Sequence, residues 1–209
     1  MSSTAMQARQ EQPDDLAGPF GMWVFLASEV LFFGGLLLAY AYGRSHWPAG
    51  FAAASRETHV VIGTVNTALL LTSSALVALA VACGESRKGR RHVALLLWGA
   101  CALGLAFLAL KGVEYATEFR EHLVPGPSFR LRDGPGAQLF YVLYFLATGL
   151  HAVHLTIGIA VLAGFAWGSR RLEGWALPRR IEAAGLYWHF VDVVWIFLYP
   201  LIYLGGRSG

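Results

Sequence analysis

The most constraining feature of this sequence is an acidic residue inside a long apolar segment. The segment runs from Trp23 to Tyr40, and Glu29 lies near its middle. A membrane-spanning helix needs about 20 apolar residues that each rise about 1.5 Å, so a helix over 20–42 would place Glu29 about 14 Å deep. An acid at that depth costs about 2.5–3.5 kcal/mol unless it faces protein, water or a polar lipid group. The segment therefore predicts a transmembrane helix that packs against other polar side chains.

The composition supports a membrane protein. Of 209 residues, 56% are hydrophobic and only 14% are charged, which excludes an ordinary soluble domain. The net charge of +3 resides in polar breaks between apolar segments, so it indicates membrane topology and not nucleic-acid binding. Cys83 and Cys101 lack the spacing of a metal site or a disulfide framework, and we interpret them as small core residues.

Five apolar segments follow one another along the chain. They predict an all-α integral membrane bundle of five transmembrane helices over residues 20–209, preceded by a polar N-terminal tail over residues 1–19. Pro48 and Gly50 fall in the first polar break and predict that the helix stops there. The predicted helices lie near residues 20–42, 59–82, 93–115, 138–167 and 184–204.

The distribution of basic residues predicts the orientation of the bundle. Arg9 and the breaks 84–92 and 168–183 carry nine Lys and Arg residues, whereas the breaks on the opposite side and the C-terminal end carry six. Cytoplasmic loops are enriched in Lys and Arg, so we expect the N-terminus in the cytoplasm and the C-terminus outside.

Polar residues recur at membrane depth in the second and third segments. Asn66 opens a run of polar residues that we expect to form interhelical hydrogen bonds, with Thr67, Thr72, Ser73 and Ser74. Lys111 and Glu114 are three residues apart and therefore share a helix face. We interpret them as an ion pair near the outer membrane boundary, with Lys111 extending toward the lipid headgroups. The other interpretation is that Glu114 contacts a partner or a lipid.

Histidines and an aspartate add polar groups to the last two segments. His151 and His154 share one helix face, but two histidines are too few for a metal site, so polar packing or lipid contact is favoured. His189 and Asp192 are also three residues apart and could pair with each other. Pro200 should kink or end the last helix. A polar interior seam of this kind fits a proton-coupled transporter, a lipid-binding cleft or an oxidase accessory subunit.

Five motifs stand out along the chain, namely MWVFLASEVLFFGG, NTALLLTSS, KGVEYATEF, ATGLHAVHLTIG and EAAGLYWHFVDVVWIFLYPLIY. Together they resemble subunit III of the haem–copper terminal oxidases. The resemblance runs from Trp23 to Leu204 and keeps the order of the family's motifs. The five-helix length resembles the short bacterial form, which lacks the first two helices of the seven-helix form, where that pair makes one wall of a lipid-filled cleft.

This resemblance implies a non-redox accessory subunit of a proton-pumping oxidase in aerobic respiration, with haem and copper in partner subunits I and II. It implies packing on subunit I, with subunit II and a small subunit IV as further partners, and phospholipid bound in a cleft. It also implies support for proton uptake, oxygen access and turnover stability. No residue is expected to be catalytic or to bind a metal or cofactor. The residues expected to line the lipid- and proton-linked polar seam are Glu29, Trp23, Asn66, Glu114, His151, His154, Glu182, His189 and Asp192.

The resemblance also favours a location and an electron donor. It implies a multi-pass protein of the bacterial plasma (inner) membrane. The acid within ASEV resembles cytochrome c oxidases more than quinol oxidases, so cytochrome c, acting through other subunits, is the favoured donor. Two alternatives remain open. One is the subunit III-like protein of a nitric oxide reductase system, and the other is a free-standing proton-coupled transporter.

Overall fold

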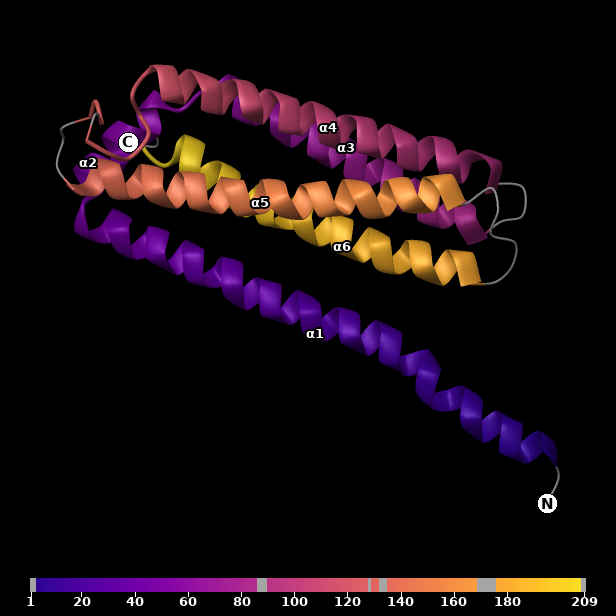
Figure 1. Ribbon diagram of the computed structural model, residues 1–209. Helices are drawn as coiled ribbons and strands as arrows, with labels where there is room; N and C mark the ends of the chain where they lie inside the picture. Colours follow the sequence, from indigo (N-terminus) through magenta and orange to yellow (C-terminus); the bar gives the residue numbers. More distant parts are fainter. Residues whose placement is uncertain (1–2, 86–89, 128, 132–134, 169–175, 208–209) are drawn as a thin grey trace.

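The part of the chain that the structure describes is helical throughout. This computed structural model describes residues 3–85, 90–127, 129–131, 135–168 and 176–207 (Figure 1). Six α-helices and a short π-helical turn follow in order: α1 (Ser3–His46), α2 (Pro48–Glu57), α3 (Val60–Glu85), α4 (Arg90–Arg120), α5 (Pro135–Gly168), α6 (Ala176–Tyr199) and η1 (Pro200–Leu204).

Five of the described helical stretches are long and apolar enough to cross a membrane. They agree with the five predicted segments, and the predicted all-α membrane class is confirmed. Helix α1 begins at one end of the bundle and η1 ends at the other (Figure 1). The stretches are Phe20–His46, Val60–Gly84, His92–Arg120, Gly136–Gly168 and Ile181–Leu204.

The first helix stops at the first polar break, as predicted, because α1 ends at His46. The break also contains a helix that was not predicted: Pro48 begins α2, which continues to Glu57. Proline suits the first turn of a helix because the N–H that it lacks would have no intrahelical partner there. Helix α1 also begins at Ser3, within the predicted tail, and α6 begins at Ala176, earlier than expected. Residues 86–89 and 169–175 of the two basic breaks lie outside the described residues.

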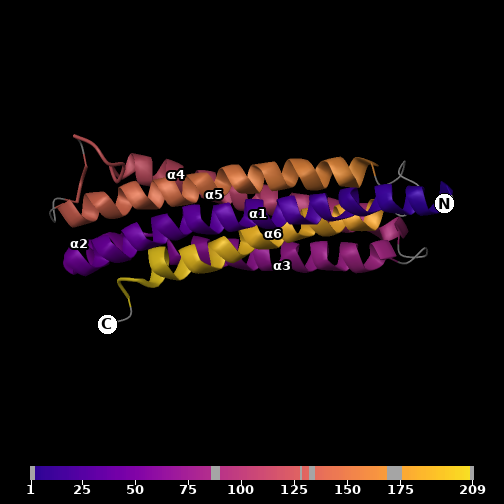
Figure 2. The ribbon, with the colours of Figure 1, turned by 90° about the horizontal axis from the view of Figure 1, so that it is seen from below.

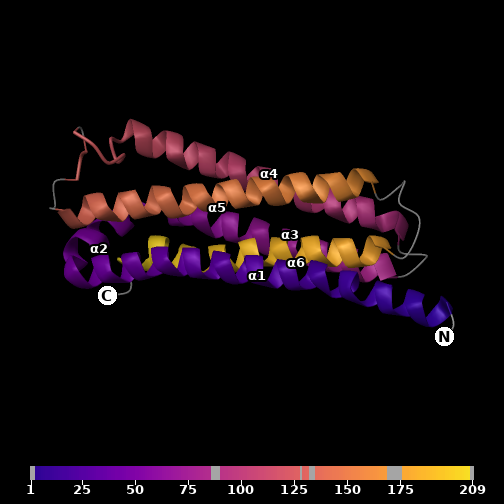
Figure 3. The ribbon, with the colours of Figure 1, turned by 60° about the horizontal axis from the view of Figure 1, so that its bottom comes forward.

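Helices α3, α4, α5 and α6 form the body of the bundle, and α1 lies at its edge. Helices α3 and α4 pack along each other as an antiparallel pair, α3 also packs on α6, and α4 on α5. Helix α1 contacts mainly α5 and α6, and it diverges from both toward its N-terminal end (Figures 1 and 3). Figure 2 views the bundle from the side on which α1 lies. In the apolar membrane-spanning part of α1, only 11% is buried, against 44% in the last span. Most of this part of α1 therefore remains available to lipid or to another protein.

Two glycines allow the core of the bundle to close around a tryptophan. Trp188 of α6 is fully buried, and Gly104 of α4 and Gly158 of α5 face its ring. A Cβ atom at either glycine would lie 3.0 Å from the indole, closer than normal packing allows. Small residues that let helices approach closely are typical of helix packing in membranes.

Pro200 ends α6, as the sequence predicted. The α-helix stops at Tyr199, and Pro200–Leu204 form a π-helical turn. Proline lacks the N–H of the normal helical ladder, which explains the change of winding at this residue. The turn directs Tyr203 into the core, where its side chain is fully buried.

Candidate functional site

Glu29 has the polar partner that its depth requires. Its Oε2 atom lies 3.0 Å from Nε2 of His154 on α5, although the two residues are 125 positions apart in sequence. The side chains are 18% exposed for Glu29 and 15% exposed for His154, so this pair lies at the α1–α5 boundary and not in the sealed core.

The second ring nitrogen of His154 defines how this pair shares protons. Nδ1 of His154 lies 2.8 Å from the carbonyl oxygen of Leu150, an acceptor, so Nδ1 carries a hydrogen and donates it. Nε2 can then accept a proton from a neutral Glu29 carboxyl group, or carry a proton and donate it to the carboxylate. Either arrangement leaves the pair with zero net charge, which explains how an acid is accommodated at this depth. The pair can hold one exchangeable proton.

Aromatic side chains from two other helices contact His154. The ring of Phe33 lies edge-on to the imidazole, with 5.3 Å between the ring centroids. The hydroxyl group of Tyr187 donates to the carbonyl oxygen of His154 at 3.0 Å. Helices α1, α5 and α6 therefore each contribute to the environment of this pair.

A second acid–base pair lies inside the bundle. Nζ of Lys111 lies 3.0 Å from Glu114 Oε2, and it donates to the hydroxyl groups of Tyr144 and Tyr203 at 2.8 Å each. The Tyr203 hydroxyl donates to Glu114 Oε1 at 2.7 Å, and the Tyr144 hydroxyl to the same oxygen at 3.2 Å. An ammonium group has three hydrogens, so every donor of Lys111 is satisfied within the protein.

This network corrects one part of the sequence interpretation. The predicted pairing of Lys111 with Glu114 is confirmed, but the predicted extension of Lys111 toward the headgroups is wrong. Lys111 is 4% exposed and Glu114 is fully buried. The amine does not need to reach the lipid surface because a carboxylate and two hydroxyl groups surround it, and the Tyr144 ring lies 4.6 Å from the nitrogen.

The predicted interhelical hydrogen bonds of α3 are found at three of five positions, all toward α6. Thr67 accepts from Trp195 Nε1 at 3.0 Å, and Ser73 accepts from Trp188 Nε1 at 3.1 Å. The Ser74 hydroxyl lies 2.6 Å from Nδ1 of His189. Thr72 instead donates to its own helix, at the carbonyl of Ala68.

Asn66 and Asp192 differ from what the sequence suggested. Asn66 is buried as expected, but neither of its side-chain polar atoms has a hydrogen-bond partner among the described residues. His189 and Asp192 do not pair, and Nδ1 of His189 instead lies against the Ser74 hydroxyl of the facing helix α3. Both carboxylate oxygens of Asp192 are buried without a hydrogen-bond partner in the described part of the chain.

The two histidines of α5 face different neighbours. His151 is 1% exposed and lies between Phe107 and Trp195, with ring centroids 5.5 and 5.1 Å away. His154 turns instead toward Glu29 on α1. Among the residues described, no three His, Cys, Asp or Glu side chains gather as a metal site would require.

The predicted polar seam is therefore a set of separate contacts. Glu29 with His154, Lys111 with Glu114, and Ser74 with His189 are three different interactions. Trp23 is 63% exposed at the edge of the bundle, and Glu182 near the start of α6 is also exposed, so neither joins these contacts within the chain.

Sequence reasoning missed two members of the buried network and one further buried acid. Tyr144 and Tyr203 hold Lys111 from α5 and η1, and only the fold brings them to α4. Glu118 is 1% exposed, and its carboxylate oxygens have no hydrogen-bond partner among the described residues. The four-residue spacing of Glu114 and Glu118 places both on one helix face, a signal that could have identified Glu118.

Comparison with known proteins identifies the family of this chain. The profile of the family described as cytochrome c oxidase subunit III matches residues 16–207. Cytochrome c oxidase subunit 3 of Thermostichus vulcanus is 33% identical over 99% of this chain and 95% of its own length. The Mus musculus protein of the same name is 32% identical over 90% of this chain and 69% of its own. The heme-copper oxidase subunit I+III of Aeropyrum pernix is 31% identical over 88% of this chain and 22% of its own.

The match extends over all five membrane-spanning stretches and includes both acid–base pairs. The relative from Thermostichus vulcanus exceeds 30% identity over nearly the full length of both chains. The chain belongs to the cytochrome c oxidase subunit III family and is an accessory subunit of a haem–copper oxidase.

Proposed function

We propose that this chain is the non-redox subunit III of a bacterial proton-pumping oxidase that takes electrons from cytochrome c. The observation that carries the proposal is the family match across residues 16–207, supported by relatives whose names specify cytochrome c oxidase. In this proposal, haem and copper reside in subunits I and II, and this chain stabilises the assembly and supports its proton and oxygen supply.

Packing on subunit I has independent support. In Aeropyrum pernix, the related protein is named subunit I+III, and this chain matches only 22% of it. We propose that separate chains keep that association, with subunit II and a small subunit IV as further partners. Helix α1 offers a suitable surface, because its outward side chains Leu31 and Leu38 are 78% and 73% exposed. Lipid or another subunit must cover such a surface in a membrane.

The Glu29–His154 pair gives the proposal its local chemistry. It lies at the margin of the bundle beside α1, partly exposed, where phospholipid would fill the space next to the helix. A pair that holds one exchangeable proton suits a role in keeping proton uptake by subunit I efficient. We further propose that the chain lies in the bacterial inner membrane, with its N-terminus in the cytoplasm and its C-terminus outside.

Purification of the tagged chain from its own membrane in mild detergent tests this proposal. Mass spectrometry should identify subunits I and II, and a reduced-minus-oxidised visible spectrum should show haem. Haem c in the complex would support cytochrome c as donor. Co-purification with a nitric oxide reductase would contradict the oxidase assignment, and a colourless chain that transports solute by itself in liposomes would favour the transporter.

A further inference from the structure

Glu118 is a buried acid that the hydrogen-bond network around Lys111 leaves without a partner. It lies on α4, two residues before the helix ends, and it is 1% exposed. Both of its carboxylate oxygens are buried, and neither accepts a hydrogen bond from any described residue. Lys111 cannot donate to them, because its three hydrogens already go to one carboxylate and two hydroxyl groups. An ionised carboxylate here would lose its water and gain no donor in return, which is strongly unfavourable.

The charges around Glu118 are already balanced without it. Lys111 and Glu114 form an ion pair of one cation with one acid. These two residues and Glu121, which is a further acid, are the charged groups that act on Glu118 in the described part of the chain. An ionised Glu118 would therefore add an uncompensated negative charge inside the bundle, and buried charges without a counter-charge are costly.

A second unpartnered polar group lies near this acid on α5, the helix that packs against α4. Tyr141 is fully buried, and its hydroxyl group has no hydrogen-bond partner among the residues that the structure describes. Of the charges that act on this hydroxyl group, that of Glu118 is the strongest, so the two groups are neighbours. A tyrosine hydroxyl can donate to a carboxyl oxygen or accept from a carboxylic acid O–H. Each group can therefore supply the partner that the other lacks.

The chain folds over Glu118 and Tyr141 where α4 ends. The backbone N–H of Leu123 donates to the carbonyl oxygen of Glu118 at 3.0 Å, and the Leu123 side chain is fully buried. Phe129 lies edge-on to the Tyr141 ring, with 5.8 Å between the ring centroids. These contacts place Glu118 beneath a covering segment, although the acid lies within one turn of the end of α4.

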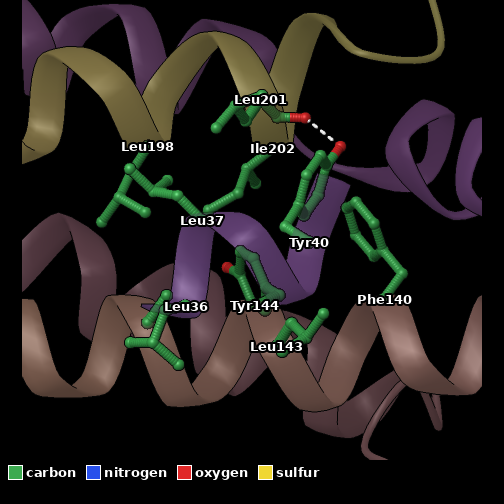
Figure 4. A pocket seen from close by; sticks show the side chains of 10 residues that line it. Leu36, Leu37, Tyr40, Phe140, Leu143, Tyr144, Leu198, Leu201 and Ile202 are labelled. Carbon is green, nitrogen blue, oxygen red and sulfur yellow. Dashed lines mark hydrogen bonds between the residues drawn. The ribbon is translucent and has the colours of Figure 1, made fainter. Parts of the chain in front are cut away.

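Tyr144 connects this site to the lysine network and borders an apolar hollow. Its hydroxyl group accepts from Lys111 and donates to Glu114, and it also lies near Glu118. Next to Tyr144, side chains of α1, α5 and α6 line a small hollow (Figure 4). The lining is apolar apart from the hydroxyl groups of Tyr144 and Tyr40, and that of Tyr40 donates to a backbone carbonyl of η1 (Figure 4). Such surroundings favour neutral groups over charged ones.

A proton fits this site better than a metal ion does. Calcium takes six to eight oxygen ligands, whereas within the described ranges no three His, Cys, Asp or Glu side chains gather in one place. A proton needs no cavity, removes the charge of the carboxylate and turns one of its oxygens into a donor.

We propose that Glu118 is a neutral acid that holds a proton inside the bundle, with the Tyr141 hydroxyl group as its hydrogen-bond partner. The site differs from the Glu29–His154 pair, because it is enclosed by protein and contains no basic partner of its own. The inference concerns the interior of one subunit and does not depend on the oxidase that the chain joins, so it stands apart from the proposed function.

Infrared spectroscopy of the intact complex tests the protonation state. The side-chain carboxyl groups of glutamate would carry ¹³C, and the spectrum of a Glu118→Gln variant would be subtracted from that of the parent. A protonated carboxyl group absorbs at a higher frequency than a carboxylate, so the variant should lose one acid band and no carboxylate band. Glu121→Gln is the matched control, because Glu121 is partly exposed three residues further along, and it should keep the acid band. Loss of a carboxylate band in Glu118→Gln would overturn the proposal.

Thermal unfolding of the same variant gives a second test. Glutamine has nearly the shape of a neutral carboxylic acid, so Glu118→Gln should assemble and unfold at the same midpoint as the parent. Failure to assemble, or a large fall in the midpoint, would show that an ionised Glu118 balances the charge of Lys111, and this result would also overturn the proposal.

A pair of tyrosine variants tests the hydrogen-bond partner. Tyr141→Phe should shift the acid band of Glu118 to a higher frequency, because a carboxyl group that loses a hydrogen bond has a stiffer C=O bond. Tyr115→Phe is the matched control, since the Tyr115 hydroxyl group already pairs with Thr148, and it should leave the band in place. An unchanged band in Tyr141→Phe would overturn the assignment of Tyr141 as the partner.

Discussion

The two acid–base pairs of this chain occupy the same membrane but very different environments. The side chains of Lys111 and Glu114 are buried, and two tyrosines complete a closed network around them. Glu29 and His154 are 18% and 15% exposed, and one hydrogen bond joins the two side chains across the α1–α5 boundary. The first arrangement fixes its charges in place, whereas the second leaves a proton that a neighbour could reach.

The difference shows how a protein can use an intramembrane acid in two ways. A buried charge is tolerated when a counter-charge and hydrogen bonds replace its water, and breaking such a set is costly. The Glu29–His154 pair, at the margin of the bundle, is neutral overall when it shares one proton. Its net charge is therefore the same whichever partner holds the proton. We therefore expect the same substitution to destabilise the complex far more at Glu114 than at Glu29.

Glu114→Gln should cause the largest loss of stability. The change leaves the Lys111 ammonium buried without its hydrogen-bonded counter-charge, which costs about 3–5 kcal/mol. Thermal unfolding of the purified complex, followed by the loss of this subunit, measures the effect. Lys111→Met combined with Glu114→Gln removes both charges and should recover much of the loss. A double variant as unstable as the single one would show that hydrogen bonds, and not charge, dominate this network.

Tyr203→Phe should have the next largest effect. The hydroxyl group accepts from Lys111 and donates to Glu114, and it connects η1 to α4. Its loss leaves a buried donor and a buried acceptor each short of one partner, at about 1–3 kcal/mol. The same unfolding assay applies. An unchanged midpoint would mean that Tyr144 alone is enough to complete the network.

Ser74→Ala should destabilise by about 1 kcal/mol, because it removes the hydroxyl partner of His189 between α3 and α6. Thr72→Ala is the matched control, since its exposed hydroxyl bonds only to its own helix and the change should stay within about 0.5 kcal/mol. Equal effects of the two substitutions would indicate that the Ser74–His189 contact contributes nothing to helix packing.

Glu29→Gln should have the smallest effect on stability, below about 1 kcal/mol, because a glutamine amide can still donate to Nε2 of His154. Its effect should fall on oxygen turnover, since glutamine cannot release a proton. Assembly and unfolding of the complex would be compared directly with those of Glu114→Gln. A loss as large as that at Glu114 would show that an ionised Glu29 makes an essential ion pair.

The sequence predicted the helices better than the contacts between them. Segment length and hydrophobicity alone were enough to predict the five membrane-spanning helices. The three-residue spacing within one helix was enough to predict the pairing of Lys111 with Glu114. The partner of Glu29 could not be deduced in this way, because it lies on another helix 125 residues away. Spacing also suggested a His189–Asp192 pair that does not form, and His189 instead contacts Ser74 on the facing helix.

Pro48 and Lys111 show the same limit of sequence-based prediction. Pro48 could either end one helix or begin the next, and only the packing of α2 against α5 shows that it begins one. Lys111 could extend to the headgroups or be buried, and the choice depends on Tyr144 and Tyr203, which are distant in sequence. Local pattern determines which residues form helices, and tertiary contacts determine which polar groups meet.

The central claim is that this chain supports an oxidase without carrying its redox chemistry. The most direct measurement follows oxygen uptake by the purified oxidase over many turnovers, with this subunit present and after its removal by detergent. We predict an initial rate that is largely unchanged, haem content that is retained, and activity that decays faster without the subunit. Loss of haem or an immediate loss of oxygen reduction on removal would contradict an accessory role.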